Sequence, residues 1–407
     1  MPPRVDLLDP AVLSDPYPLF HRLRTEDPVH WEADLEFWAL TRYADALYAL
    51  REDSLLSSAI HDSPRPGGVG LSSARWFVFL DPPRHTRLRA LVHSAFTPQV
   101  VEGLRARIQA IVDELLDRAA EAGRLDLIAD LGFPLPAIVI AELLGVPAED
   151  RAQFRAWSAD LAAAGGLVRM AADGAERLSR ARAGGAALNA YFRDIIRERR
   201  RAPRDDLVSR LTGVQSAEGT LSEEELVDTC ALLLFAGHET TTNLIGNGLL
   251  GLLRHPDALN ALRADPALIE PAVEELLRYD GPTQAQVRVA LEDIGLHGKT
   301  IRASDRVFVM VNAANRDPAR FADPDRVDLT RADNAHVAFG YGAHFCVGAP
   351  LARLEGQIAI AAAVRRLGDL ALAPGDLTWL PSMVFRGVRS LPVTFTPSRR
   401  TGYAAGP

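Results

Sequence analysis

The stretch FGYGAHFCVG, residues 339–348, contains Cys346, one of only two cysteines in the 407-residue chain. Glycines flank this cysteine, and the apolar run that follows has helical spacing, with Pro350 in its first turn. A helix N-terminus favours a thiolate. Glycines let backbone amides turn towards the sulfur and leave space for a flat partner. The pattern therefore favours a cysteine that binds a metal.

Three other roles fit the same residues less well. A dinucleotide-binding GxGxxG motif would need a third glycine where the chain has Phe345, and no strand–turn–helix unit surrounds the loop. A catalytic cysteine would need a histidine beside it. His344 is two residues away in an extended loop, too close to point at the same spot. A structural core thiol would not need the flanking glycines.

Residues 222–254 are predicted to form a long helix. Ser222 and Glu225 match a capping box, and Pro256 lies just beyond the far end. At 1.5 Å per residue such a helix is about 48 Å long. Its run CALLLFAG is apolar on every face. We expect this helix to cross the core of the molecule.

The stretch AGHETTTN places polar side chains in the middle of this apolar helix. A zinc-protease HExxH motif would need a histidine at position 242, where the chain has Thr242. A polar face turned to solvent is the plain alternative, and the apolar surroundings disfavour it. The pattern favours a helix kinked at a functional site, where threonine hydroxyls compete for backbone carbonyls and Gly237 leaves room for a ligand.

Most of the chain has helical periodicity, for example residues 98–123, whereas β-like runs are confined to residues 28–43 and 287–316. This segregation predicts an α+β fold dominated by helices, which we expect to form one domain over residues 1–407. Irregular stretches at 57–84 and 161–185 are expected to be functional or disordered, and a mobile lid over a pocket fits both alternatives.

Composition narrows the function classes. A net charge of −8 with dispersed arginines gives no case for nucleic acid. Glycine and polar residues break the apolar runs, so no membrane span is expected. The N-terminus has no apolar signal core, and two cysteines do not make a disulfide framework. We expect a cytoplasmic protein.

The cysteine stretch resembles the haem-binding loop of the cytochrome P450 family. Its pattern FxxGxxxCxG is matched by Phe339, Gly342, Cys346 and Gly348. The resemblance covers essentially the whole chain. It implies heme b (iron protoporphyrin IX), with the thiolate of Cys346 as the iron ligand. It also implies a predominantly helical fold with smaller β-sheets, in which the haem lies between the helix at 222–254 and the cysteine loop.

Other motifs resemble those of the family. EELLR resembles its ExxR motif, and Glu275 and Arg278, with Arg326, would form a triad that braces the cysteine loop. Taken alone, ExxR is more often a surface helix pair. The implied propionate contacts are His85, Arg89, Arg288 and His344, and the other implied haem contacts are Cys346, Phe339, Gly340, Ala236 and Gly237.

The activity implied by the resemblance is insertion of one oxygen atom of O2 into a lipophilic small molecule. AGHETT resembles the oxygen-activation helix. There Thr240 would order water by hydrogen bonds and Glu239 would relay protons. Thr241, the next residue in the sequence, also matches the motif. A polyketide, macrolide, terpenoid or fatty acid is the expected substrate. The expected pocket residues are Trp76, Phe77, Phe79, Leu233, Ala236, Thr240, Val287, Met383 and Phe385.

Electrons would come from a ferredoxin or flavodoxin with its reductase, because the chain has no flavin or NAD motif. Arg87, Arg107 and Arg353 are candidates for docking such an acidic partner, and a monomer is expected. Two alternatives are a peroxide-driven peroxygenase of the same fold and a non-enzymatic haem sensor or carrier. The Glu239–Thr240 pair argues against both.

Overall fold

A computed structural model describes residues 9–61, 75–93, 96–119, 121–150, 153–154, 156–157, 160, 174–213 and 219–397. Helices dominate the fold, and they are α1 (Pro10–Ser14), α2 (Tyr17–Glu26), α3 (Tyr43–Arg51), α4 (Arg84–His93), α5 (Pro98–Glu102), α6 (Arg105–Ala119), α7 (Pro134–Leu143), α9 (Gly174–Arg201), α10 (Leu207–Gly213), α11 (Glu223–Arg254), α12 (Pro256–Ala264), α13 (Ile269–Asp280), α14 (Val311–Ala314) and α15 (Ala349–Arg366). Parts of the two irregular stretches, residues 62–74 and 161–173, lie outside the described residues.

Short strands form three small sheets. The largest has the order β1 (Val29–Glu32), β2 (Phe37–Leu40), β8 (Arg306–Val309), β5 (Gln286–Ala290) and β3 (Leu56–Ser57). The second has the order β4 (Arg124–Asp126), β10 (Pro392–Thr396) and β9 (Gly368–Leu372), and β6 (Ile294–Leu296) pairs with β7 (Lys299–Ile301). Only the β2–β8 pair is parallel among these ladders of the described residues.

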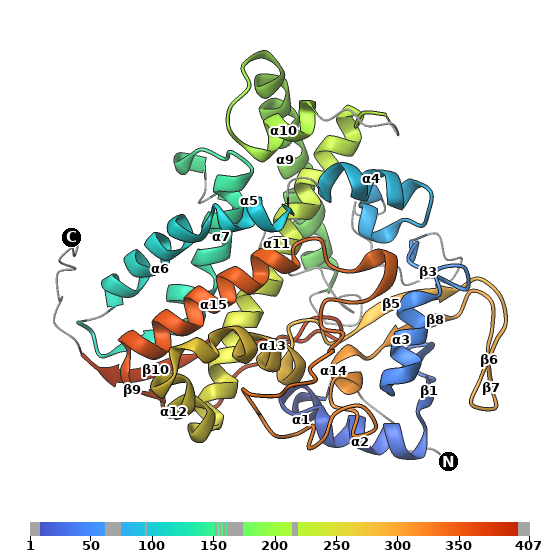
Figure 1. Cartoon of the computed structure of the whole chain (residues 1–407). Coiled ribbons are helices and arrows are strands. Elements are labelled where there is room, and N and C mark those ends of the chain that lie inside the picture. Colours follow the sequence, from blue (N-terminus) through green and yellow to red (C-terminus); the bar gives the residue numbers. More distant parts are fainter. Residues whose placement is uncertain are drawn as a thin grey trace.

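The largest sheet and most of the helices occupy different parts of the molecule, as the sequence predicts, whereas the sheet of β4, β10 and β9 lies on the helical side. The helices from α5 to α13, with α15, gather around α11, and the largest sheet lies at the other side beside α3 (Figure 1). The two predicted β regions supply β1, β2 and β5–β8. The predicted α+β architecture is therefore confirmed.

Helix α11 is the central element of the helical part. Ser222 caps it, and the capping box with Glu225 is present with both hydrogen bonds. It packs against α7, α9, α13 and α15, so most of its side chains are buried. The exception is its middle, where Ala236 is exposed and Gly237, Glu239 and Thr240 are half-buried. The core helix thus has an accessible point at the predicted functional stretch.

The run at 98–123 forms two helices instead of one. Thr97 caps α5 through a side-chain bond to the Val100 amide. At Gly103 the backbone tightens, because the next amide, of Leu104, bonds the carbonyl of Val101, three residues back. The helix therefore breaks before α6, which continues along α15.

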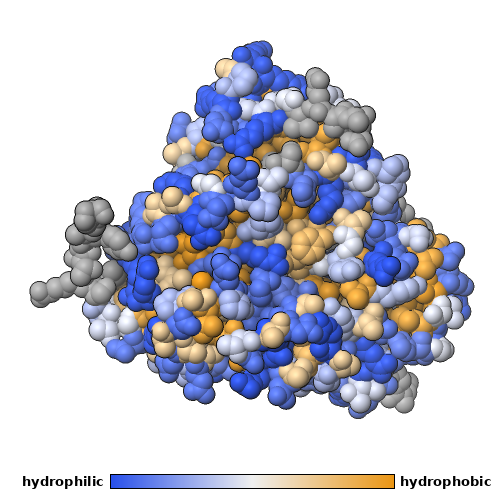
Figure 2. Space-filling view, in the orientation of Figure 1, coloured by the Kyte–Doolittle hydropathy of each residue, from blue (hydrophilic) through white to orange (hydrophobic). Residues whose placement is uncertain are grey.

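Polar residues cover most of the surface seen in Figure 2, with apolar groups between them. Of the helices in the described ranges, none combines the length and apolar character needed to cross a bilayer.

Candidate functional site

The loop that carries Cys346 is fixed by its own backbone. The Cys346 amide donates to the carbonyl of Phe339 at 2.9 Å, which closes the loop. Gly342 has a φ of +71°, and a Cβ atom there would lie 2.8 Å from the carbonyl oxygen of Leu50. Only glycine meets both conditions. Gly348 then caps α15, so Cys346 stands just before a helix N-terminus, as the sequence predicts.

The electrostatic surroundings of Cys346 are mixed. Backbone amides of Gly348 and Ala349 bond to the sulfur, and the cations of Arg89 and Arg353 lie near it; all four lower its pKa. Desolvation by the surrounding protein acts in the opposite direction and is the largest cause, so the pKa of the thiol is raised overall, although the cysteine is exposed at the surface of the chain. A coordinated metal deprotonates a thiol outright.

Basic side chains from three elements meet beside the cysteine loop. His85 of α4 stacks on His344 of the loop, with ring centroids 3.9 Å apart. The pKa of His85 is lowered to about 4 and that of His344 to about 3, chiefly by burial, and nearby arginines contribute in the same direction. Arg288 of β5 lies near both rings, and burial lowers its pKa to about 10. The pKa of Arg89, one turn after His85, is also lowered by burial.

This basic cluster has hydrogen-bonding capacity that the described residues do not satisfy. Both ring nitrogens of His85, Nε2 of His344 and Nε of Arg288 are buried without a hydrogen-bond partner within the described part of the chain. Buried polar groups without partners are costly. A neutral imidazole supplies one N–H donor and Arg288 Nε supplies another, so an anionic partner would satisfy these donors, and the two propionates of a haem have that character. The residues present therefore fit a haem whose iron meets Cys346.

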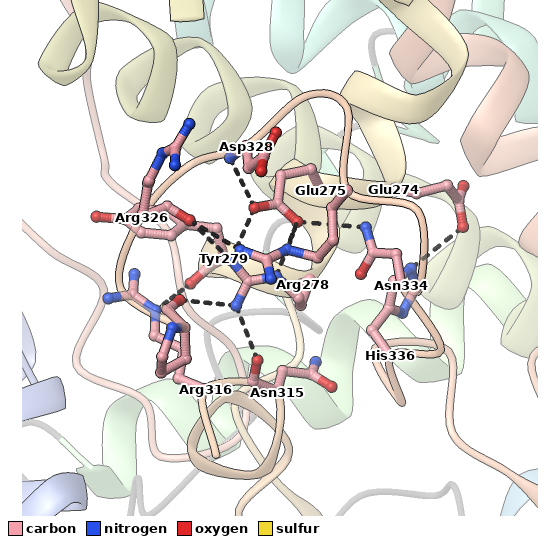
Figure 3. Close-up of polar contacts among 12 residues, drawn as sticks. Glu274, Glu275, Arg278, Tyr279, Asn315, Arg316, Arg326, Asp328, Asn334 and His336 are labelled. Atoms are coloured by element: carbon pink, nitrogen blue, oxygen red, sulfur yellow. Dashed lines mark hydrogen bonds and ion pairs between the residues drawn. The ribbon is translucent and has the colours of Figure 1, made fainter. Parts of the chain in front are cut away.

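Behind the loop, Glu275 and Arg278 form a buried ion pair on α13 (Figure 3). The side chains have 0% exposure, and Arg278 donates from Nε to Oε2 and from Nη2 to Oε1, both at 2.8 Å. The alternative of a routine surface pair is wrong. The third nitrogen of the guanidinium, Arg278 Nη1, donates to the carbonyls of Asn315 and Pro324 at 3.0 and 2.8 Å.

The third member of this network differs from the prediction. Arg326 takes part through its carbonyl oxygen, which accepts from Arg278 Nη2 at 3.1 Å. The side chain that pairs with Glu275 is that of Arg331, with Nε 3.1 Å from Oε2. Asn315 links the network to the cysteine loop, since its Oδ1 accepts from the Val337 amide at 2.8 Å. The predicted side-chain role of Arg326 is therefore corrected to Arg331.

In the middle of α11 the threonines bond back to their own helix. Thr240 Oγ1 donates to the Ala236 carbonyl at 2.6 Å, and Thr242 Oγ1 donates to that of His238 at 3.0 Å. The predicted competition for carbonyls is present, although α11 remains helical without a break through this stretch. Burial raises the pKa of Glu239 to about 7, and its Oε2 has no hydrogen-bond partner among the described residues.

An aromatic arc lies beside this accessible part of α11. The ring of Phe235 is 5.3 Å from that of Trp76 and 6.2 Å from that of Phe385, and Trp76 stacks on Phe79 at 6.4 Å. Phe235 lies between Leu233 and Thr240, the part of the long helix that the sequence predicts to line the pocket. Phe77, also predicted, has its ring 6.3 Å from that of His85 and so connects the arc to the basic cluster.

Two other predicted pocket residues pack in a different core cluster. Met383 is 1% exposed and lies in this cluster with Phe20 and Met310, and Val287 packs against it. Met383 and Val287 therefore support the sheet side of the fold. Leu233 belongs to the same buried cluster as Trp76 and Phe77.

The arginines predicted to dock a redox partner are each paired inside the chain. Arg107 bonds Glu142 at 2.7 Å and Arg353 bonds Glu274 at 2.6 Å. Arg87 pairs with Glu225, the residue of the capping box. Their charge is partly neutralised by these carboxylates. The cysteine loop instead exposes two aromatic side chains, Tyr341 at 46% and Phe345 at 40%, next to the exposed Cys346.

Comparisons with known proteins agree with this site. The cytochrome P450 family profile matches residues 70–368. The chain is 43% identical to cytochrome P450 monooxygenase PikC of Streptomyces venezuelae, over 100% of this chain and 97% of that protein. It is 42% identical to vitamin D(3) 25-hydroxylase of Pseudonocardia autotrophica, over 96% of each chain.

Solved structures give the same result. The bacillaene polyketide synthase cytochrome P450 PksS of Bacillus subtilis has a TM-score of 0.89 and 36% identity, covering 96% of this chain and 100% of that one. The fold, the cysteine loop and these similarities together establish that the chain belongs to the cytochrome P450 family and is a monooxygenase that uses a haem iron.

Proposed function

We propose that the protein binds heme b and inserts one oxygen atom of O2 into a lipophilic secondary metabolite, by hydroxylation or epoxidation. The observation that carries the substrate class is the aromatic arc of Trp76, Phe79, Phe235 and Phe385 beside the accessible middle of α11. Aromatic walls suit apolar ligands. Relatives named for a polyketide pathway and for vitamin D(3) support a polyketide, macrolide or terpenoid, and a fatty acid has the same apolar character.

The haem, when bound, supplies oxygen activation at an iron whose cysteine thiolate ligand favours O–O cleavage. The residues of the chain position it and manage protons. Cys346 would bind the iron. The basic cluster of His85, Arg89, Arg288 and His344 would hold the two propionates and satisfy the unpartnered buried donors there.

Protons would pass through Glu239 and Thr240. A carboxyl with a pKa of about 7 is divided between its acid and base forms at neutral pH, so Glu239 can both accept and release a proton at Oε2. The Thr240 hydroxyl bonds its own helix and can turn to donate to water beside α11. The aromatic arc would exclude bulk water from the substrate.

Monooxygenases of this family take electrons from a redox partner. We propose a ferredoxin or flavodoxin with its reductase as the source here, and a monomeric, single-domain protein in the cytoplasm. Because the candidate arginines are paired internally, we assign a role in docking to the exposed aromatics Tyr341 and Phe345 of the cysteine loop. Both lie close to the proposed iron ligand in sequence.

The ultraviolet–visible spectrum of the reduced, carbon monoxide-bound protein tests the ligand. A strongly red-shifted Soret band is expected for thiolate ligation, and a band at the position of histidine-ligated haem proteins would contradict the proposal. A screen of lipophilic compounds for spin-state shifts then tests the substrate class. Shifts with polar compounds alone would argue against a lipophilic substrate.

A further inference from the structure

Segment 75–79 contacts α11 at two points on one helix face. Arg75 Nε lies 3.0 Å from Asp228 Oδ2, and its Nη2 lies 3.4 Å from Glu224 Oε2. The next residue, Trp76, places its ring 5.3 Å from that of Phe235. Asp228 and Phe235 are seven residues apart, so they share one face about two turns from each other. Arg75 and Trp76, which are consecutive, thus contact the same face of α11, one through an ion pair and the other through an aromatic contact.

The other side of the aromatic arc is held differently. Phe385 is followed by Arg386, whose buried guanidinium lies 2.5 Å from Asp280 and whose carbonyl accepts from Asn247 Nδ2 at 2.9 Å. The Phe385 amide itself donates to Ser382 Oγ at 3.0 Å. These contacts are almost entirely inside the protein. The Phe385 side of the arc is therefore rigidly positioned.

The Trp76 side depends on a pair at the protein surface. The Arg75 side chain is 47% exposed, whereas that of Asp228 is 5% exposed. Burial raises the pKa of Asp228, and Arg75 is the first of the groups that oppose this rise. Without Arg75 the buried carboxylate would lose its ion-pair partner and keep only the weaker influence of Arg193 and Arg84 against that of Glu224, which is costly. The position of Trp76 is thus stabilised in part by the ion pair that its neighbour Arg75 makes with the buried Asp228.

We propose that Arg75 and Asp228 are positioning residues for substrate selection: their ion pair sets the position of Trp76 against Phe235 and so the width of the lipophilic site. This inference rests on the proposed function, because it assigns the aromatic arc to the substrate. Neither residue touches the substrate itself. Weakening the pair lets Trp76 move, while Phe385 stays where the buried network holds it.

Two iron-binding probes of different size test this in the haem-loaded protein. Imidazole and 4-phenylimidazole bind through the same nitrogen, but only the second has a ring that extends towards the arc. We expect Arg75→Gln and Asp228→Asn to weaken 4-phenylimidazole binding about fivefold, the effect of one half-exposed ion pair. Imidazole binding should stay within twofold of the wild type. Spectral titration measures both dissociation constants.

Salt and matched variants separate this role from general destabilisation. Added 0.5 M sodium chloride should weaken 4-phenylimidazole binding in the wild type and not in Arg75→Gln, because the charge pair is screened. Arg75→Lys keeps the cation and should retain most of the wild-type affinity. Arg193→Gln is the control: Arg193 pairs with the same Glu224 at 3.0 Å but belongs to α9, and both affinities should be unchanged.

The carbon monoxide spectrum of each variant is recorded first. Absence of thiolate ligation in the wild type would defeat the proposed function, whatever the probes show. If ligation is normal and Arg75→Gln has the wild-type ratio of the two dissociation constants, the pair does not position Trp76. Arg75→Gln changes a half-exposed residue and remains testable if Asp228→Asn fails to fold.

Discussion

Arg278 and Glu275 face each other one turn apart on α13, with two parallel hydrogen bonds of 2.8 Å and no exposed side-chain surface. The other side-chain hydrogen bonds of Arg278 and Glu275 are all made with the irregular segment that follows α14. Glu275 also accepts from the Asp328 amide at 2.9 Å and from Asn334 Nδ2 at 3.3 Å. The pair therefore orders the chain that leads into the cysteine loop.

Removing one partner of this pair should prevent stable haem-loaded protein. Glu275→Ala leaves Arg278 buried without its carboxylate, at a cost of roughly 3–5 kcal/mol. Haem content per protein and the midpoint of urea unfolding measure the loss. Glu270→Ala, at an exposed position on the same helix, is the control and should behave as the wild type. Normal yields of loaded Glu275→Ala protein would show that the pair does not brace the loop.

Arg331→Ala and Arg326→Ala should differ, although both remove an arginine from the same segment. Arg331→Ala removes a bond to the buried Glu275. We expect this loss to lower the free energy of unfolding by about 1–3 kcal/mol. Arg326 keeps its carbonyl contact with Arg278 after the substitution, so a change within about 0.5 kcal/mol is expected. Urea unfolding of both variants decides the matter. A larger loss for Arg326→Ala would restore the predicted triad.

Cys346→Ser should abolish thiolate ligation. No other soft anionic side chain lies in the loop. The reduced, carbon monoxide-bound spectrum should lose its red-shifted band, or the variant should fail to retain haem. Cys230→Ser is the matched control. That thiol is fully buried on α11 and its pKa is raised to about 12 by burial, so its removal should leave the spectrum unchanged. The opposite pattern would assign the ligand to Cys230.

Thr240→Ala should change the fate of oxygen more than the stability of the protein. The hydroxyl makes one bond, to its own helix, and alanine has the higher helix propensity. Haem binding should survive, while product per reductant consumed falls several-fold and hydrogen peroxide rises. Product, peroxide and reductant are measured in one assay with a substrate from the screen. Thr242→Ala removes the buried neighbour and should keep normal coupling. If Thr240→Ala produces as much product per reductant consumed as Thr242→Ala and the wild type, Thr240 is not part of the proton path.

Glu239→Gln should stabilise the protein at high pH and slow turnover. The folded pKa of about 7 lies above the ordinary value of 4.5, so folding favours the protonated acid. That contribution is complete below pH 4.5 and is lost as the pH rises to about 7. The variant should therefore match the wild type near pH 4 and unfold at a higher temperature at pH 8. A pH-independent difference in melting temperature would mean that Glu239 titrates normally.

The features that could be predicted from the sequence are those determined by residues close to one another in the chain. The capping box of Ser222 and the loop around Cys346 depend on neighbours a few residues apart, and both have the predicted local structure. The strand β4 could not be predicted, because three residues carry no periodicity and it is stabilised by pairing with β10, about 270 residues away.

Side-chain direction in irregular or uniformly apolar segments was also beyond the sequence. Arg326 and Arg331 both lie where no helix or strand fixes which way a side chain points, so only the tertiary contacts show which one meets Glu275. Met383 and Phe385 are two apolar residues in one short irregular segment, and hydrophobicity does not tell which packs in the core and which joins the aromatic arc.

The bonds of Arg278 have a consequence for protein engineering. Between α14 and the turn at Gly342–His344 the described chain has no helix or strand, and such surface stretches usually accept inserted residues. Here a single guanidinium spaces the carbonyls of Asn315, Pro324 and Arg326, so an added residue would shift at least one of them out of reach. The hairpin of β6 and β7 is anchored beside its tip, where His297 pairs with Asp45 and Lys299 pairs with Asp27, but the tip residue itself, Gly298, faces open space, since a Cβ atom there would meet nothing within 4 Å. Peptide tags and fused domains should be tolerated in that hairpin and rejected in the longer, less regular segment.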